Sequence, residues 1–583
     1  MRQPAILLLT LILGSAAFAQ TTPTGPHKPT PAPEPAKAVG PGSSLPASAQ
    51  AAMKAIDPNH IKAHVRFLSS DLLEGRGTGQ RGGDIAAEYI ATQFQAYGLK
   101  PAGENGTYFQ KVPMVGITTE PTSTISLTLP TKTMDLRLGD DVVAMDESQD
   151  KSSELDADLV FVGYGIEAPE YKWNDYKDVD VKGKVLLMLV NEPPSDDPNF
   201  FKGKALTYYG RWTYKYEEAA RKGAVGVIII HKTEMASYGW DVVRNSWGGE
   251  RSYLRATGQP KLNLASWVQL DIARQIAQAS GKDLDQLMEQ ARSRDFKPVP
   301  LPIKVKAHMN SLIRPFDSQN VLAMLPGSDP KLKDQAVIYS AHYDHLGIHP
   351  GEKGDNIYNG AIDNATGCAV LLEMARAFSL SSQKPKRSIL FASVTAEEQG
   401  LRGSEFLGLH PPIPAGDITL GLNYDGVAPE GIPEHVEVAG AERTSFYPVV
   451  EETAHNFGMQ IKPDSNPGAG FYYRSDHFSF ARVGIPAFSV NQGMKFKGHP
   501  EEWGIEQEKI YNEKHYHQPS DEYDNSWDFT GVADMTRFGF DLGWKAASAP
   551  DRVAWKSGDE FEAARKNSLK QLTPASEATG KSQ

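Results

Sequence analysis

The chain has 583 residues, a formal net charge of -12 and one cysteine, Cys368. Its length allows several domains and a large core, and its 40% hydrophobic and 23% charged residues are typical of a water-soluble globular protein. The acidic balance argues against a broad nucleic-acid interface, which needs a basic face. A single cysteine excludes intrachain disulfides and sites built from several thiolates, so any metal must be held by oxygen and imidazole ligands.

The first residues have the order of a secretory signal peptide. Arg2 provides a positive charge, residues 5–13 are apolar but too few to cross a bilayer, and residues 17–19 form a small-residue cleavage site. We expect residues 1–19 to be a signal peptide and the proline-rich residues 20–50 to be an extended linker outside the fold. The protein is then exported to the periplasm or the extracellular space, without a membrane span in the mature chain. The alternative for its start is a buried helix.

Two amphipathic helices are expected next. Apolar residues recur at helical spacing in residues 61–68 and again in 85–97, where Gly98 ends the pattern. Between these helices, the glycines of residues 74–79 exclude a helix and predict a loop. We assign residues 51–140 to the first part of a domain that resumes at residue 311.

Residues 141–310 differ in texture and are expected to form a compact unit of their own. Apolar runs at 159–163, 185–190 and 225–230 predict strands, and residues near 214–222 predict a helix. The acidic and basic side chains are scattered and form no catalytic arrangement. We therefore predict a β-rich or α+β insert.

From residue 315 onward, short apolar strands alternate with amphipathic helices. The expected strands are 320–325, 336–341, 388–394 and 418–424, and the expected helices are 365–378 and 401–409. This order predicts an α/β fold with a mostly parallel mixed sheet and helices on both faces. We place this domain at 311–547 and a polar C-terminal tail at 548–583. In such sheets, functional groups gather at the carboxyl ends of the strands.

Candidate metal ligands follow these strands one after another. They are His342 and Asp344 after the second strand, Asp363 before the first helix, Glu397 and Glu398 after the third strand, and Asp425 after the fourth. Imidazole and carboxylate are ligands that Zn²⁺ and harder divalent ions accept. Adjacent carboxylates repel each other unless a cation or a proton lies between them. The set therefore predicts a metal site at one edge of the sheet.

Several of these residues also have a purely structural explanation. Glu397 and Glu398 fit a solvated turn, and Asp363 fits the N-cap of its helix, a role that is compatible with metal binding. We expect His345 and His349 either to contact the metal ligands without binding the metal themselves or to lie at the surface, because they lie three or more positions past the strand end and are less well fixed.

Five motifs, in one order along the chain, resemble those of the secreted bacterial dizinc aminopeptidases of the transferrin-receptor/aminopeptidase superfamily. The motifs are residues 340–344 (SAHYD), 360–367 (GAIDNATG), 395–404 (TAEEQGLRGS), 423–425 (NYD) and 516–521 (YHQPSD). Residues 67–76 are also similar to the N-terminal helix and loop of this family, and 141–310 to the protease-associated domain often inserted there. The resemblance covers residues 57–545 and implies a zinc-exopeptidase fold.

The family pattern implies a centre of two zinc ions. One ion would be bound by His342, Asp363 and Asp425, and the other by Asp363, Glu398 and His517, with Asp363 bridging them. Asp344 would orient His342, and Glu397 would act as the general base. The pattern also implies a cis peptide bond between Asp363 and Asn364.

Two further residues receive roles from the same pattern. Tyr516 would stabilise the oxyanion together with one zinc ion, although a packed core tyrosine is the alternative. Arg474 matches a substrate-binding arginine of the family, and a surface ion pair is its alternative. The loops 467–473 and 491–503 have no pattern that can be transferred, so the residue preference stays open.

The function that this resemblance implies is that of a metallo-aminopeptidase, which hydrolyses N-terminal residues of peptide or protein substrates through a water shared by two metal ions. A carboxypeptidase or dipeptidase with the same ligands is one alternative. A receptor-like binding protein without catalysis is another, and the complete ligand set counts against it. A single-zinc cyclase on a similar fold is a further alternative.

Overall fold

The structure, a computed structural model, describes residues 45–572 except 237, 256–257, 350–352 and 464–466. The predicted signal peptide and the linker up to residue 44 lie outside the described residues. In the part of the chain that is described, no helix is both long enough and apolar enough to cross a bilayer.

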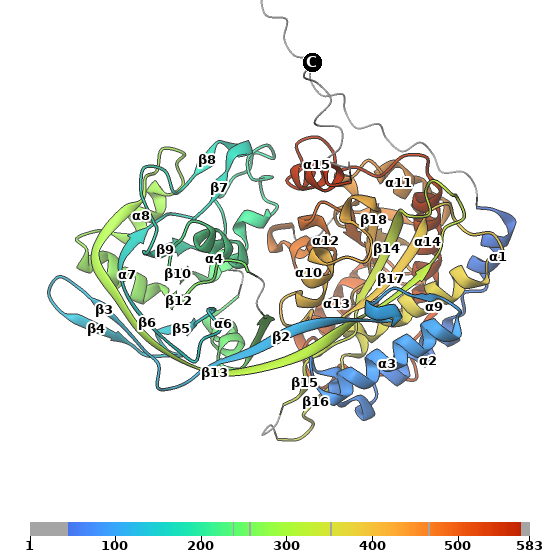
Figure 1. The fold of residues 1–583 in the computed structure, drawn as a ribbon, viewed down its shortest axis with the longest axis horizontal. Helices are drawn as coiled ribbons and strands as arrows, with labels where there is room; N and C mark the ends of the chain where they lie inside the picture. Colours follow the sequence, from blue (N-terminus) through green and yellow to red (C-terminus); the bar gives the residue numbers. More distant parts are fainter. Residues whose placement is uncertain (1–44, 237, 256–257, 350–352, 464–466, 573–583) are drawn as a thin grey trace, which may run out of the picture. The chain divides into compact units, whose positions relative to one another are not determined.

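The domain with the candidate ligands is built on a mixed sheet (Figure 1). Its strands lie in the order β21 (Ala487–Ser489), β18 (Ile418–Asn423), β14 (Ala336–His342), β17 (Ser388–Val394) and β13 (Val299–Leu325). The first four strands are parallel to one another, and β13 is antiparallel to β17. The predicted mostly parallel mixed sheet is confirmed.

Helices cover both faces of this sheet. Successive side chains of a strand point to opposite faces, so neighbouring apolar residues of one strand pack into two different cores. Tyr339 of β14 belongs to one hydrophobic core, and its neighbour Ile338 belongs to another. The first core includes residues of α2 (Pro58–Leu68), α3 (Arg81–Ala96), α9 (Gly367–Leu380) and α14 (Thr530–Ser548), and the second includes residues of α10 (Arg402–Leu409) and α12 (His477–Arg482). The fold class therefore agrees with the prediction.

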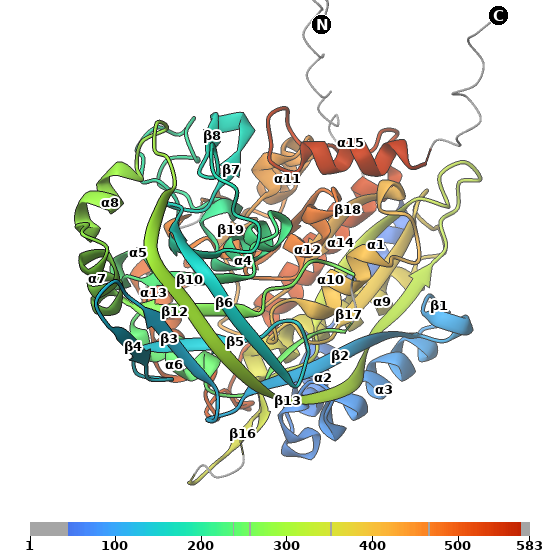
Figure 2. The same ribbon diagram turned by 60° about the vertical axis from the view of Figure 1, so that its left-hand side comes forward.

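The strand β13 is much longer than the predicted strand at 320–325. It runs over Val299–Leu325 and pairs with β17 near its end and with β6 (Ser152–Phe161) near its start. Figure 1 shows its full curved course, and Figure 2 shows its first part beside β6. Buried and exposed positions alternate along much of the strand. Pro300, Pro302 and Pro315 obscured this alternation, since proline argues against a strand.

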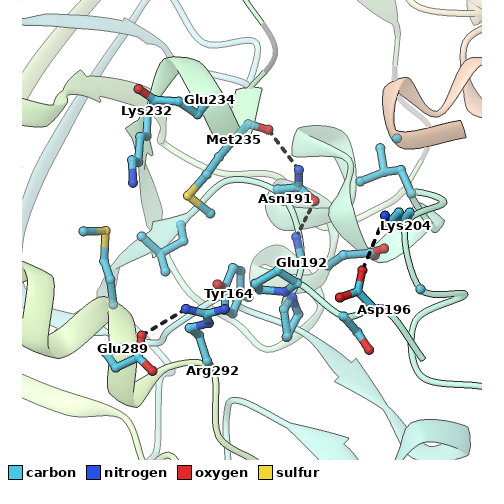
Figure 3. A pocket seen from close by; sticks show the side chains of 18 of the residues that line it. Tyr164, Asn191, Glu192, Asp196, Lys204, Lys232, Glu234, Met235, Glu289 and Arg292 are labelled. Carbon is cyan, nitrogen blue, oxygen red and sulfur yellow. Dashed lines mark hydrogen bonds and ion pairs between the residues drawn. The ribbon is translucent and has the colours of Figure 1, made fainter. Parts of the chain in front are cut away.

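The region 141–310 contains its own run of parallel strands. They are β6, β9 (Val185–Leu189), β10 (Gly226–His231) and β12 (Leu264–Gln269), and the helix α4 (Trp212–Arg221) precedes β10. A cavity of about 710 Å³ opens at the carboxyl ends of β9 and β10, and Figure 3 shows Glu192 and Lys232 among its lining residues. The lining residues come from 164–292 and include Gly468 from the ligand-bearing domain.

The described part of the segment after residue 548 is folded against the domain that carries the candidate ligands. It contains the helix α15 (Glu562–Lys570), where Arg565 donates hydrogen bonds to the backbone oxygens of Ala415 and Ile418. Phe561 packs in a cluster with Tyr472. This part of the predicted tail therefore supports the start of β18.

His64 on α2 should give the stability of the folded chain a measurable pH dependence. Its ring nitrogens lie 2.8 Å and 3.2 Å from the hydroxyl oxygens of Tyr89 and Tyr97, and burial lowers the pKa of His64 to about 4. The unfolded chain binds this proton near pH 6.5 and the folded chain only near pH 4, so stability is lost as the pH falls through this range. The loss reaches about 3 kcal/mol. We expect His64→Gln to reduce the dependence of the unfolding free energy on pH over this range, as measured by denaturant unfolding at a series of pH values. An equal dependence on pH in the variant and the wild type would contradict this assignment.

Candidate metal centre

The candidate ligands meet at one edge of the sheet because neighbouring parallel strands end there. The strand β14 ends at His342, Glu398 follows β17, and Asp425 follows β18. Asp363 lies in the helical turn before α9, and His517 follows the helix α13 (Glu501–Lys514). Side chains from separate segments therefore reach a single place.

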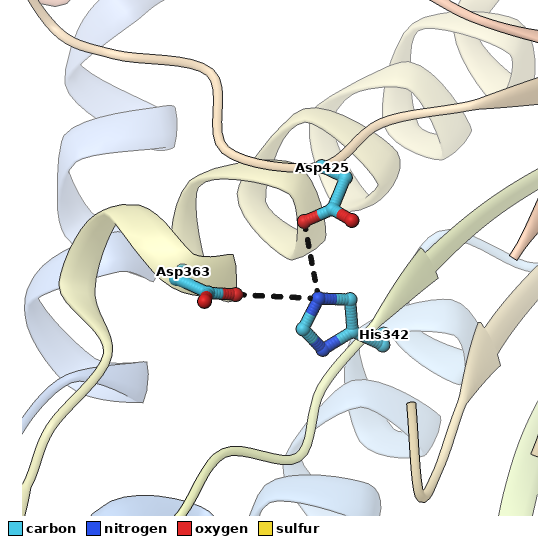
Figure 4. Close-up of side chains that lie close together, drawn as sticks. All are labelled: His342, Asp363 and Asp425. Carbon is cyan, nitrogen blue, oxygen red and sulfur yellow. Dashed lines mark hydrogen bonds and ion pairs between the residues drawn. The ribbon is translucent and has the colours of Figure 1, made fainter. Parts of the chain in front are cut away.

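His342 lies between two carboxylates (Figure 4). Its Nε2 is 3.1 Å from Oδ1 of Asp425 and 3.4 Å from Oδ1 of Asp363. His342 is buried, whereas Asp425 is partly exposed. Each of these three residues offers one ligand atom within a small space that could hold a metal ion. Imidazole and carboxylate together form a donor set that zinc accepts.

His517 forms a second group with the other oxygen of Asp363. The Nε2 of His517 is 3.3 Å from Oδ2 of Asp363 and 3.1 Å from Oε2 of Glu398. Asp363 thus gives one oxygen to each group, which is the arrangement that a bridging carboxylate requires. The peptide bond between Asp363 and Asn364 is cis, as the family pattern implied.

The protonation of these groups shows that the site needs positive charge. Burial opposes ionisation of Asp363, but the neighbouring imidazoles of His342 and His517 hold its pKa well below its ordinary value. Burial also opposes a charge on His517, but the carboxylates of Glu398 and Asp363 raise its pKa to about 11. Protons on the imidazoles thus occupy the place where cations would bind. The three carboxylates and two imidazoles fit divalent metal ions.

Asp344 holds the turn that carries Glu397. Its carboxylate accepts hydrogen bonds from the backbone nitrogen of Glu397 (3.1 Å) and from the hydroxyl of Thr78 (3.0 Å). The Nδ1 of His342 lies 3.2 Å from the backbone oxygen of Asp344 and 3.8 Å from its carboxylate. The family pattern implied an orienting contact through the side chain, whereas the nearer contact here is made by the backbone oxygen.

Residues of the 141–310 region support the same turn. Gln399 accepts a hydrogen bond from the backbone nitrogen of Ser252 in β11 (Arg251–Leu254), at 3.3 Å. The guanidinium of Arg402 lies over the ring of Tyr253, 5.0 Å from its centroid. The position of Glu397 therefore depends on contacts with a strand that lies far away in the sequence.

Glu397 and Tyr516 both lie beside the ligand groups. The Oε2 of Glu397 is 4.0 Å from Nε2 of His342. The ring of Tyr516 stacks on His517 with a centroid distance of 3.9 Å, and 47% of Tyr516 is exposed. The exposure of Tyr516 differs from that of a packed core tyrosine.

Arg474 lies on the loop next to the site. Its side chain is exposed, and its guanidinium lies over the ring of Phe471, 5.2 Å from the centroid. The following residue, Ser475, donates a hydrogen bond of 2.6 Å to Oδ2 of Asp425. The contact of Ser475 with Asp425 thus places the backbone of Arg474 near the site, while the side chain of Arg474 contacts Phe471.

One supporting residue, Asp521, received no role from the sequence. Asp521 accepts hydrogen bonds from the backbone nitrogens of Ile362 (3.0 Å) and Asp363 (3.1 Å), and its place in the motif 516–521 was the available signal. His345, expected either to contact the ligands or to lie at the surface, is only 1% exposed and has its Nδ1 2.7 Å from Oε1 of Glu398. Its position three residues after His342 did not identify Glu398 as its partner.

Comparison with known proteins identifies the segment that carries these groups. Residues 320–538 match the family described as Peptidase family M28. A probable zinc metalloprotease of Pyrenophora teres f. teres (strain 0-1) is 38% identical over 106 residues, which are 18% of this chain and 22% of that protein. Leupeptin-inactivating enzyme 1 of Streptomyces exfoliatus is 26% identical over 218 residues, or 35% of this chain and 43% of that protein. The chain therefore spans less than half the length of these relatives.

Among solved structures, an aminopeptidase from Aneurinibacillus sp. strain AM-1 aligns with 88% of this chain and 98% of its own, with a TM-score of 0.46 and 18% identity. The family match lies outside the region 141–310, whose assignment to a protease-associated domain stays a prediction. The match contains all five candidate ligands, so residues 320–538 are the part of the chain that is similar to peptidase family M28.

Proposed function

We propose that this chain is a zinc-dependent aminopeptidase, which removes N-terminal residues from peptides. The observation that carries the proposal is the shared carboxylate of Asp363, which lies 3.4 Å from Nε2 of His342 and 3.3 Å from Nε2 of His517 through different oxygens. The match of residues 320–538 to a peptidase family supports peptides as substrates. The name of a similar protein, a probable zinc metalloprotease, supports zinc as the metal and peptide hydrolysis as the reaction.

The residues that would hold two zinc ions fall into the two groups described above. They are His342, Asp363 and Asp425 for one ion, and Asp363, Glu398 and His517 for the other. Bound zinc ions supply Lewis acidity and lower the pKa of a water molecule toward neutrality. The protein contributes the donor atoms, and it holds them on strand ends and turns that are buried or nearly so.

Glu397 is the group that moves protons in this proposal. Its Oε2 would accept a proton from the attacking water and deliver it to the nitrogen of the leaving amine. Burial, with the charges of Asp425 and Glu398, raises the pKa of Glu397 well above its ordinary value. A general base must be ionised, so nearby positive charge has to lower this pKa before Glu397 can accept the proton. Asp344 assists by fixing the backbone nitrogen of Glu397.

Tyr516 and Arg474 would bind the substrate. The partly exposed ring of Tyr516, stacked on His517, can present its hydroxyl to the oxyanion that develops during peptide hydrolysis. Arg474 lies on the neighbouring loop, and its exposed guanidinium can bind a backbone oxygen of the substrate peptide. We also propose that 141–310 is a protease-associated insert, and that residues 1–19 direct export.

Substitution of the shared carboxylate should weaken the binding of both zinc ions, whereas substitution of a ligand in one group should weaken the binding of one. We expect Asp363→Asn to weaken both zinc equivalents and Asp425→Asn to weaken one, each by at least about 10- to 100-fold. The measurement is zinc per chain after dialysis against graded chelator. Full zinc content in Asp363→Asn would contradict the bridging role, and less than about one zinc in the wild-type chain would favour the receptor-like alternative.

Glu397→Gln should separate catalysis from metal binding. Glutamine keeps the shape of the side chain but cannot accept the proton, so we expect kcat to fall by about 10²- to 10⁴-fold while zinc content is unchanged. Glu104→Gln, at an exposed position, is the matched control and should retain full activity. Retention of activity in Glu397→Gln would exclude it as the general base.

The direction of hydrolysis can be tested with blocked substrates. An aminopeptidase needs a free terminal amine, so a peptide amide should be cleaved and its N-acetylated form rejected. Cleavage of the N-acetylated form together with a need for a free C-terminal carboxylate would indicate a carboxypeptidase on the same site, and a need for both free termini would indicate a dipeptidase. Product analysis by mass spectrometry distinguishes these outcomes.

A further inference from the structure

His345 is held rigidly beside the second ligand group. Its backbone nitrogen donates a hydrogen bond to the backbone oxygen of Arg76 at 3.2 Å. The buried guanidinium of Arg76 donates to the backbone oxygens of Tyr343 (2.7 Å), Asn359 (2.5 Å) and Gly360 (2.8 Å). One arginine thereby joins the loop that carries His345 to the loop that leads to Asp363.

The imidazole of His345 also has little room to turn. A Cβ atom at Gly360 would lie 2.5 Å from Cγ of His345, so this glycine allows the ring to pack directly on the backbone. The ring of His345 meets that of His517 at a centroid distance of 5.7 Å and an angle of 75°. The side chain is thus fixed by close packing as well as by its hydrogen bond.

Glu398 lies between two imidazoles, and each contacts a different oxygen. Its Oε1 is 2.7 Å from Nδ1 of His345, and its Oε2 is 3.1 Å from Nε2 of His517. A proton on Nδ1 of His345 makes this nitrogen the donor and leaves the carboxylate charged. Glu398 therefore has one oxygen restrained by the protein and one directed toward His517.

The distances to Asp363 separate the roles of the two imidazoles. The Nε2 of His517 is 3.3 Å from Oδ2 of Asp363, whereas Nδ1 of His345 is 4.0 Å from the same oxygen. His517 thus approaches both carboxylates of the second group, while His345 makes its short contact with Glu398 alone. His345, Asp363 and Glu398 also lie close enough together to hold an ion. The short contact with Glu398 alone favours an orienting role for His345 over direct coordination.

We propose that His345 is a positioning residue for the second metal ion: it fixes Glu398 through Oε1 so that Oε2 is available to the ion together with Asp363 and His517. The inference rests on the proposed two-metal function. Fixing a flexible glutamate in advance lowers the entropy lost when the metal binds. Residues in such orienting contacts change metal affinity by about 10- to 100-fold when substituted.

The test is a titration of the metal-free chain with Zn²⁺ in competition with a chromophoric chelator. We expect His345→Ala to leave the first equivalent unchanged and to weaken the second by about 10- to 100-fold. We expect His345→Asn, whose amide nitrogen can replace Nδ1 as the donor, to bind the second equivalent within a few-fold of wild type. His349→Ala, on the same loop, is the matched control and should bind as wild type does.

Two results would overturn the role of His345. Equal binding of the second equivalent by His345→Ala and wild type would show that Glu398 needs no orienting donor. If His345→Asn were as weak as His345→Ala, and the absorption spectrum of the Co²⁺-loaded variant had lost a nitrogen ligand, His345 would coordinate the ion directly. Thermal unfolding of each metal-free variant separates these effects from misfolding.

The same titration separates this inference from the proposed function. A wild-type chain that binds two equivalents but hydrolyses no peptide overturns the aminopeptidase assignment and leaves the role of His345 intact. A wild-type chain that binds one equivalent or none overturns the two-metal centre and the role of His345 with it.

Discussion

Repulsion between buried carboxylates is the constraint on which the candidate metal centre depends. Asp363 is buried at the edge of the sheet and lies close to Asp425 in one group and to Glu398 in the other. Such groups remain charged only when positive charge lies between them. The imidazoles of His342 and His517 occupy that place, each in contact with two carboxylates. An arrangement so unfavourable by itself is understandable when its purpose is to bind cations.

The fold meets this constraint by attaching the ligands to rigid elements. Adjacent parallel strands fix the spacing of His342 and Asp425 through the register of β14 and β18. The turn with Asp363 is tied down by the carboxylate of Asp521, which accepts two consecutive backbone N–H groups. The guanidinium of Arg76 joins the flanking loops. Preorganisation of this kind places donor atoms before a metal arrives, which is a requirement of tight and selective binding.

The sequence predicted the parts of this structure that depend on local pattern. The continuous apolar runs of β14, β17 and β18 were located within a residue of their ends, because strands covered on both faces have no polar side to obscure them. The long course of β13 was missed, since its prolines argue against a strand. Strand order could not be read from pattern, yet the rule for strand ends placed His342 and Asp425 at one edge.

The supporting contacts were beyond prediction for a different reason. His345 touches Glu398 across a gap of 53 positions in the chain, and Arg76 reaches Tyr343 across 267. Such pairs leave no local periodicity. Their partners are often backbone oxygens, which every residue carries. The motifs therefore indicate which side chains are candidate metal ligands, whereas the reason that they stay in place requires the folded chain.

The contact of β11 with the turn at Gln399 and Arg402 has a consequence for how the region 141–310 can change. A chain shortened by excising that region would lose Ser252 and Tyr253, and with them the outer support of Glu397. It would also lose most of the first half of β13, which continues into the ligand-bearing sheet. The region is thus a structural neighbour of the catalytic turn, and any replacement for it would have to rebuild that packing surface.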